Sequence, residues 1–96
     1  MTFDAGGAHR LSPRVGLRPE PFGALAYHYD TRRLVFLKDP LLVELVEALV
    51  HHPSARAAVD RVVADAARRP SFLAALASLA GSGVVEPQHA TLRETA

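Results

Sequence analysis

The sequence contains no cysteine, so the chain can form no disulfide, carry no thiolate nucleophile and hold no cysteine-ligated cluster. It also lacks a charge imbalance, because 11 Lys and Arg against 10 Asp and Glu leave a net charge of +1. Such a chain has no overall electrostatic attraction to nucleic acid or to an anionic membrane. Any redox chemistry around this protein therefore belongs to a partner.

Long apolar runs are missing as well. The most apolar window, Leu41 to Val50, is interrupted by Glu44 and Glu47 and is far shorter than the roughly 20 residues that a membrane span needs. The N-terminus, MTFDAGGAHR, has no basic region followed by an apolar run and so contains no secretory signal. We therefore expect a cytoplasmic protein without a membrane partner.

Recognisable catalytic and metal-binding motifs are absent too. The chain has no G-x-S-x-G, no P-loop and no G-x-G-x-x-G motif. Its five histidines contain no pair spaced i, i+4, whereas metal sites need three or four convergent ligands. We expect a protein that is not an enzyme and that has no catalytic residues, no metal site and no cofactor.

What remains is the composition of one small globular domain, with 96 residues, 49% of them hydrophobic and 22% charged. Residues 1–10 contain two glycines and a single large apolar residue, Phe3, without periodicity, which predicts a flexible tail. Residues 87–96 are polar and aperiodic and predict a second tail. The folded domain is expected to span residues 11–86.

The centre of the domain is the stretch from Leu17 to Lys38, LRPEPFGALAYHYDTRRLVFLK. Apolar residues alternate in two runs, which is typical of strands, and the polar pair Asp30-Thr31 between the runs predicts an antiparallel hairpin. A preceding run with Val15 and Leu17 adds a strand. The predicted strands cover residues 12–18, 24–29 and 32–38.

The two outer strands of this sheet differ in how well their edges are protected. Pro13, Pro19 and Pro21 bracket the first strand, and proline has no backbone N–H with which to bind a neighbouring strand. The third strand has neither Pro nor Gly, and an unprotected edge of this kind indicates that an extended peptide adds there. The alternative, a core strand covered by the chain itself, stays open at this point.

Three helices are predicted after the sheet. Asp39-Pro40 is a typical helix start, with Asp as the N-cap and Pro at the first helical position. Apolar periodicity predicts helices over residues 40–51, 54–67 and 70–80, and Val84-Val85 is compatible with a short last strand. The third helix carries no charge from Ser71 to Gly81, so we expect it to be covered on both sides and to wall a groove together with the open strand edge.

Three helices followed by a glycine turn and a short strand also fit a winged helix-turn-helix DNA-binding regulator. In such a protein the third helix reads base edges through Arg, Lys, Asn or Gln side chains, and this helix has none. Arg68 and Arg69 precede it and could contact phosphate groups. DNA binding is therefore the alternative function.

The residues RPEPFGALAYHYDTRRLVFLK, a Pro-led helix, two more helices and the ending L-x-x-L-x-G-x-G-V-V together resemble a known family. That family is the peptide chaperones of the mycofactocin system, which are related to the small chaperone of pyrroloquinoline quinone biosynthesis. The resemblance covers about Arg10 to Glu86. Its most specific parts are the Arg18 to Phe22 turn and the residues Thr31 to Leu34.

The resemblance implies an α+β RiPP recognition element, which is a winged-helix-like domain with a three-stranded antiparallel sheet followed by three α-helices. Such a domain binds the leader region of a ribosomally made precursor peptide and presents it to a radical S-adenosylmethionine maturase. In the mycofactocin system the product is a peptide-derived redox cofactor. In that family the leader adds as a strand beside the third strand and lies against the third helix.

Carried onto this sequence, those two walls define the predicted peptide-binding residues. They are Arg32, Arg33, Leu34, Val35, Phe36, Leu37, Ala74, Ala75, Ser78 and Leu79. Arg32 and Arg33 would suit an acidic leader. Whether the free protein also forms a homodimer through its open strand edge is left open by the sequence.

Overall fold

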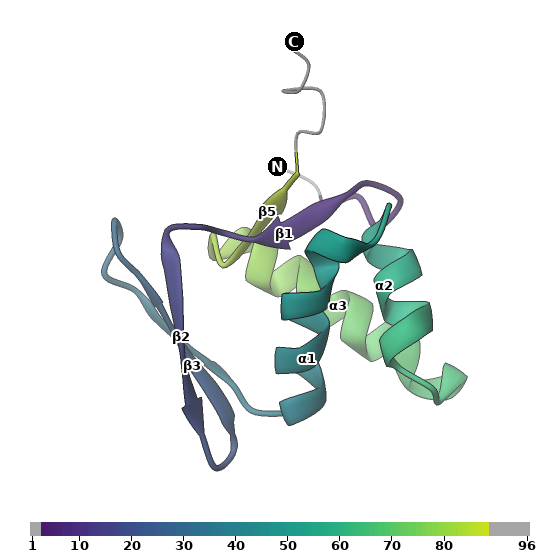
Figure 1. The fold of residues 1–96 in the computed structure, drawn as a ribbon, viewed down its shortest axis with the longest axis horizontal. Coiled ribbons are helices and arrows are strands. Elements are labelled where there is room, and N and C mark those ends of the chain that lie inside the picture. Colours follow the sequence, from purple (N-terminus) through teal and green to yellow (C-terminus); the bar gives the residue numbers. More distant parts are fainter. Residues whose placement is uncertain (1–2, 89–96) are drawn as a thin grey trace, which may run out of the picture.

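The computed structural model describes residues 3–88 and has the predicted α+β class, with a three-stranded antiparallel sheet and three α-helices (Figure 1). A second, two-stranded sheet joins the two ends of this part of the chain. In order, the elements are β1 His9–Leu11, β2 Val15–Glu20, β3 Gly23–His28, β4 Leu34–Leu37, α1 Pro40–Ala48, α2 Ala55–Val62, α3 Arg69–Gly81 and β5 Val85–Pro87. Short 3-10 turns cover Leu49–His51 and Ala66–Arg68.

The three-stranded sheet has the order β2-β3-β4 and packs one face against α1. Ala24 and Ala26 of β3 and Leu37 of β4 point to this inner face and are fully buried. The two alanines are small, so α1 can approach β3 closely, and the larger alternate residues Leu25 and Tyr27 occupy the outer face. The rest of the core comes from the facing sides of the three helices and from β5.

The turn between β3 and β4 sets where β4 begins. Arg32 adopts a left-handed conformation with φ of 62°, and its N–H donates to the carbonyl oxygen of His28 at 2.8 Å. The N–H of Arg33 donates to the hydroxyl of Thr31, 3.2 Å away. Because these bonds close a turn, β4 starts at Leu34, whereas the alternation of the sequence placed the strand start at residue 32.

α1 and α2 begin where their caps predict, but both are shorter than the apolar stripes suggested. The Asp39 side chain accepts a hydrogen bond from the N–H of Leu41 in α1, and the Ser54 side chain accepts one from the N–H of Ala57 in α2. α1 gives way to a 3-10 turn at Leu49, and α2 ends at Val62, where Val63 turns extended. The Arg69 side chain donates to the carbonyl oxygen of Val63 at 2.8 Å, which caps this helix end. Within residues 3–88, no helix is both long and apolar enough to cross a membrane.

The segment from Phe3 to Arg10 differs from the tail that the sequence predicted. Its carbonyl oxygens at Ala5 and Gly7 accept hydrogen bonds from the first two N–H groups of α2, at Arg56 and Ala55. β1 pairs antiparallel with β5, and His9 is buried. The segment is ordered because it supplies acceptors that a helix start otherwise leaves unpaired. The predicted C-terminal tail lies, from residue 89 onward, outside the described residues.

Gly23, the first residue of β3, is fixed by the backbone around it. It has φ of 147°, and a β-carbon at this position would collide with the carbonyl oxygen of Leu37 and lie 3.1 Å from the amide nitrogen of Asp39. Only glycine fits this conformation and this close approach. The contact ties the start of β3 to the end of β4 and to the α1 cap.

We expect Gly23→Ala to lower the free energy of unfolding by at least about 2 kcal/mol, because it adds backbone strain and a clash with main-chain atoms. Gly81→Ala is the matched control, since Gly81 ends α3 and has no atom near its β-position. Alanine there should be neutral or stabilise the helix by up to about 1 kcal/mol. Urea unfolding measures both, and equal effects would contradict the assignment.

Candidate functional site

The open edge of β4 is the central feature of the site. The N–H of His28 donates to the carbonyl oxygen of Arg33 at 3.0 Å, and hydrogen-bonded pairs alternate along an antiparallel ladder. Val35 and Leu37 therefore direct their N–H and C=O groups toward β3. Those of Leu34 and Phe36 point to the open side, where residues 3–88 provide no partner for them.

The opposite edge of the sheet, along β2, is blocked. The N–H of Tyr29 donates to the carbonyl oxygen of Arg14, so by the same alternation Val15, Leu17 and Pro19 point away from β3. The N–H of Val15 donates to Ser12, and Pro19 has none to offer. An incoming strand would find at most one free donor on β2, whereas β4 offers donors and acceptors at two successive outward positions.

The side chains of the predicted strand residues divide between two faces. Leu34 is 56% and Phe36 is 58% exposed on the outer face. Val35 is half-buried on the inner face, and Leu37 is fully buried there. Arg32 and Arg33 are exposed and lie in the turn before the strand, so their backbones do not extend the edge.

On α3 the predicted residues also separate. Leu79 is 5% exposed and belongs to the core, while Ala74 and Ser78 are exposed. Ala75 lines a hollow of about 210 Å³ where the chain passes from β4 into α1. The other residues that line it are Asp39, Leu42, Arg68, Ser71 and Phe72.

Most of the residues around this hollow were not predicted as part of the site. Arg68 forms an ion pair with Asp39 at 3.2 Å, and its guanidinium lies 5.1 Å from the ring centre of Phe72. The hollow exists because the N-terminal ends of α1 and α3 meet beside the end of β4. The sequence marks Asp39 as a helix cap but contains no signal for this meeting of distant segments.

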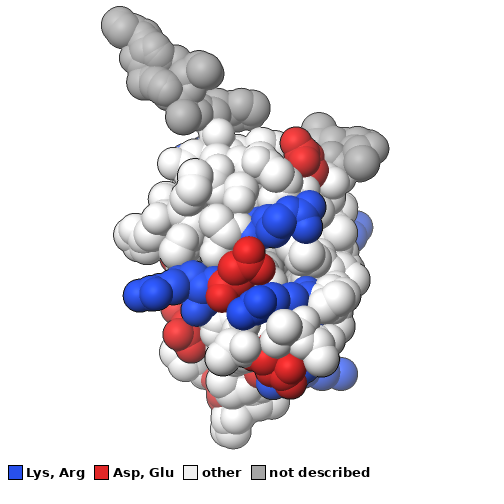
Figure 2. Space-filling view, turned by 90° about the vertical axis from the view of Figure 1, so that its right-hand side faces the viewer, with Lys and Arg blue, Asp and Glu red and all other residues white. Residues whose placement is uncertain are grey.

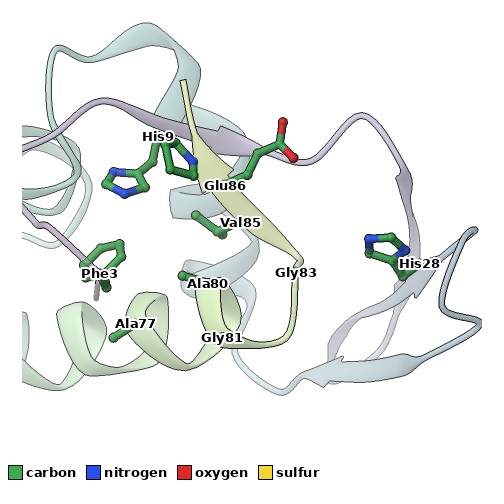
Figure 3. Close-up of a pocket in the computed structure, with 10 residues that line it drawn as sticks. Phe3, His9, His28, Ala77, Ala80, Gly81, Gly83, Val85 and Glu86 are labelled. Carbon is green, nitrogen blue, oxygen red and sulfur yellow. The ribbon is translucent and has the colours of Figure 1, made fainter. Parts of the chain in front are cut away.

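A larger pocket of about 420 Å³ lies at the other end of α3 (Figure 3). Ala77 and Ala80 of the helix form one wall, and the β1–β5 ribbon forms another. Phe3 and His9 lie on the ribbon side with ring centres 4.7 Å apart, and His28 closes the far side next to Gly83. The uncharged surface of α3 therefore borders a cavity at each of its two ends. The larger pocket was not predicted from the sequence, because Phe3 and His9 were assigned to a flexible tail.

The basic residues at the start of α3, Arg68 and Arg69, are already engaged. Arg68 pairs with Asp39, and Arg69 donates to the carbonyl oxygen of Val63 and lies 3.9 Å from Asp60. On the face that holds α2, Lys and Arg side chains lie among Asp and Glu and do not form a continuous basic surface (Figure 2). These observations weigh against contacts between α3 and the phosphate groups of DNA.

No group of three or more His, Cys, Asp or Glu residues is placed to hold a metal ion in the part of the chain described. His9 lies 2.8 Å from the carbonyl oxygen of Gly7 through Nδ1. His28 Nδ1 lies 3.2 Å from the N–H of Asp30 and 3.3 Å from that of Thr31. Both histidines thus have local backbone partners that account for their positions.

Comparison with known proteins identifies the family. The model of the peptide chaperone MftB family matches residues 8–86 of the 96-residue chain. The chain belongs to this family. The resemblance found in the sequence is thereby confirmed, and a peptide chaperone has a non-catalytic role, so the chain is not an enzyme.

Family members from mycobacteria are similar over most of their length. The chain is 43% identical to the peptide chaperone MftB of Mycobacterium ulcerans over 92% of this chain and 81% of that protein. It is 42% identical to that of Mycobacterium tuberculosis, over 93% and 82% of the two chains. The corresponding protein of Mycolicibacterium smegmatis is 47% identical over 91% of this chain and 85% of its own length. No solved structure matches the chain.

The backbone directions in β4 predict unequal losses of stability for proline at neighbouring positions. Val35→Pro should lower the free energy of unfolding by about 3 kcal/mol, because it deletes an N–H that bonds β3 and leaves a carbonyl unpaired. Phe36→Pro deletes an N–H on the open side, which edge strands tolerate. Relative to Phe36→Ala, it should cost less than about 1 kcal/mol in thermal or urea unfolding. A larger loss at residue 36 than at residue 35 would show that the alternation is reversed.

Proposed function

We propose that this chain binds the leader region of a ribosomally made precursor peptide and delivers it to a radical S-adenosylmethionine maturase in mycofactocin biosynthesis. The observation that carries the proposal is the open edge of β4, where residues 3–88 leave the outward backbone groups of Leu34 and Phe36 unpaired. Membership of a peptide chaperone family supports it. The chemistry then belongs to the maturase, and the chaperone supplies capture and orientation.

Backbone pairing provides the first part of the affinity. An antiparallel peptide strand exchanges two hydrogen bonds with each outward-facing residue, which gives about four with Leu34 and Phe36. Each such bond adds about 1 kcal/mol at most to the net free energy of binding, so backbone pairing alone gives weak capture of any extended peptide. Side-chain contacts must provide the rest of the affinity and the selectivity.

The inner side of the added strand provides those contacts. Residues directly opposite one another in a sheet point to the same face, so the peptide residues opposite Val35 and Leu37 are directed toward the helices. The second of these lies near the hollow that Leu42, Phe72 and Ala75 line. A small side chain at Ala75 leaves that hollow free for an apolar residue of the peptide.

Cations flank the edge at both ends and favour an acidic leader. Arg32 and Arg33 precede β4, Lys38 follows it, and none of the three forms a salt bridge within residues 3–88. The same charges disfavour pairing of β4 with β4 of a second copy, because antiparallel pairing would bring the arginines of one chain toward the lysine of the other. The edge thus selects a peptide over another copy of the chain.

The groove assignment is tested by Ala75→Glu, measured by fluorescence anisotropy with the labelled precursor peptide. Thermal stability should change by only about 0.5 kcal/mol, because the free protein keeps the carboxylate wet, while peptide affinity should fall at least about tenfold. Ala74→Glu is the matched control, since the neighbouring alanine is exposed and does not line the hollow. Equal peptide binding by both folded variants would remove α3 from the site. The proposed function itself fails if the unmodified chain does not bind the peptide.

Charge reversal at Arg32→Glu together with Arg33→Glu should weaken binding of an acidic leader by about tenfold at low salt. The difference should shrink as salt is raised, because exposed charges are screened. Peptide titrations at two ionic strengths measure this effect. An unchanged affinity at low salt would show that the two arginines do not read the leader.

A further inference from the structure

Four of the five large hydrophobic side chains that are strongly exposed in residues 3–88 lie on one surface. They are Phe22 at 41%, Tyr29 at 55%, Leu34 at 56% and Phe36 at 58% exposure, and the fifth is Val50. This surface is the side of the β2-β3-β4 sheet that faces away from α1. Leu25 and Tyr27 point to the same side. We use the name outer face for the surface formed by these two residues and the four exposed ones.

The outer face is continuous from one end of the sheet to the other. Leu25 is the cross-strand neighbour of Phe36, and Tyr27 is that of Leu34. At one end the rings of Phe22 and Phe36 meet edge to face at 5.8 Å, and at the other Tyr29 lies over Gly16. A hollow of about 520 Å³ opens between Leu25, Tyr27, Tyr29 and Leu34, so the surface can receive an inserted apolar side chain. A clustered apolar surface of this kind marks an interaction site.

The outer face borders the peptide edge directly. Leu34 and Phe36 contribute their side chains to the outer face and their outward N–H and C=O groups to the open edge of β4. In an added strand, the residues opposite these two would point to the same side and enlarge the apolar surface. A protein that covers the outer face would therefore contact the chaperone and the bound peptide at the same time.

The charges around the outer face identify the kind of partner. Along β2 the arginines are neutralised by Arg14–Asp30 and Arg18–Glu20 ion pairs, both at less than 3 Å. Along β4, Arg32, Arg33 and Lys38 form no salt bridge in the described chain, and Lys38 lies over the Phe36 ring. A second copy would bring three cations against three, which is unfavourable. An apolar patch with carboxylates at its rim is complementary.

We propose that the outer face docks the enzyme that receives the peptide, through an apolar patch rimmed by Asp or Glu on that enzyme. The inference rests on the proposed function, because it takes the recipient enzyme from there. It assigns the two sides of β4 different tasks: the open edge holds the peptide, and the outer face holds the enzyme. Because both share Leu34 and Phe36, a bound peptide would complete the enzyme's docking surface.

The experiment uses the full chain carrying Phe22→Asp and Tyr29→Asp, two exposed positions that the peptide edge does not include. Biolayer interferometry measures binding to the radical S-adenosylmethionine maturase of the same organism, with and without the precursor peptide, and anisotropy measures binding of the peptide alone. We expect maturase affinity to fall at least tenfold, because the new carboxylates meet an acidic rim, while peptide affinity changes less than twofold. Val50→Asp is the control for an exposed apolar residue elsewhere and should change neither. Phe22→Ser with Tyr29→Ser replaces the pair if the aspartates reduce folding measured by circular dichroism.

Unchanged maturase affinity in the folded double variant would overturn the proposal. So would sedimentation showing that the wild-type chain is a dimer and the double variant a monomer with maturase binding intact, because a second copy would then be the occupant. If the double variant loses maturase binding and the wild-type chain does not bind the peptide, the docking surface is supported and the proposed function is rejected. If the wild-type chain binds the peptide and the double variant binds the maturase as well as the wild type does, the proposed function is supported and the docking surface is rejected.

Discussion

The antiparallel pairing of β3 with β4 is the interaction on which the rest of the structure depends. Its hydrogen-bond alternation decides that Val35 and Leu37 bond inward and that Leu34 and Phe36 face the open side. The same pairing sends Ala24 and Ala26 to the inner face, where α1 packs, and sends the larger residues outward. One register thus fixes the edge, the core and the exposed apolar surface together. A shift of this pairing by one residue would turn the core-facing side chains outward, the exposed ones inward, and change which backbone groups face the open edge.

In the proposed function, this arrangement admits a peptide strand on one side of the sheet and excludes it on the other. The β2 edge is closed by Pro19 and by the bond from Val15 to Ser12, so a strand can add to the sheet on one side only. In the same proposal, the cations beyond both ends of β4 disfavour self-pairing and favour an acidic ligand. In the proposed complex the uncharged side of α3 forms the second wall of the peptide site, and a charged side chain at Ala75 would then be buried by the ligand.

Local chemistry made much of this predictable from the sequence. Period-two alternation, the prolines around the first strand and the Asp39-Pro40 cap each act over a few residues, and the family followed from the same stretch. The misses are long-range or conformational. A short last strand was predicted at Val84-Val85, but β1 and its pairing with β5 across nearly the whole chain were not, and the Arg10–Glu86 ion pair joins the two strands. Arg32 takes a left-handed conformation that propensity disfavours, and the hollow beside Ala75 needs two helix ends to meet.

The pairing of β1 with β5 has a consequence for how this domain can be combined with others. His9 lies opposite Pro87, so the strands nearest the two ends of residues 3–88 lie side by side (Figure 1). The turn between β2 and β3, which contains Phe22, lies at the far end of the three-stranded sheet (Figure 1). A second domain fused genetically at either terminus would therefore attach away from that turn and from the hollow at Ala75. A second domain could therefore be attached before or after this one in the chain with the same effect on the sheet.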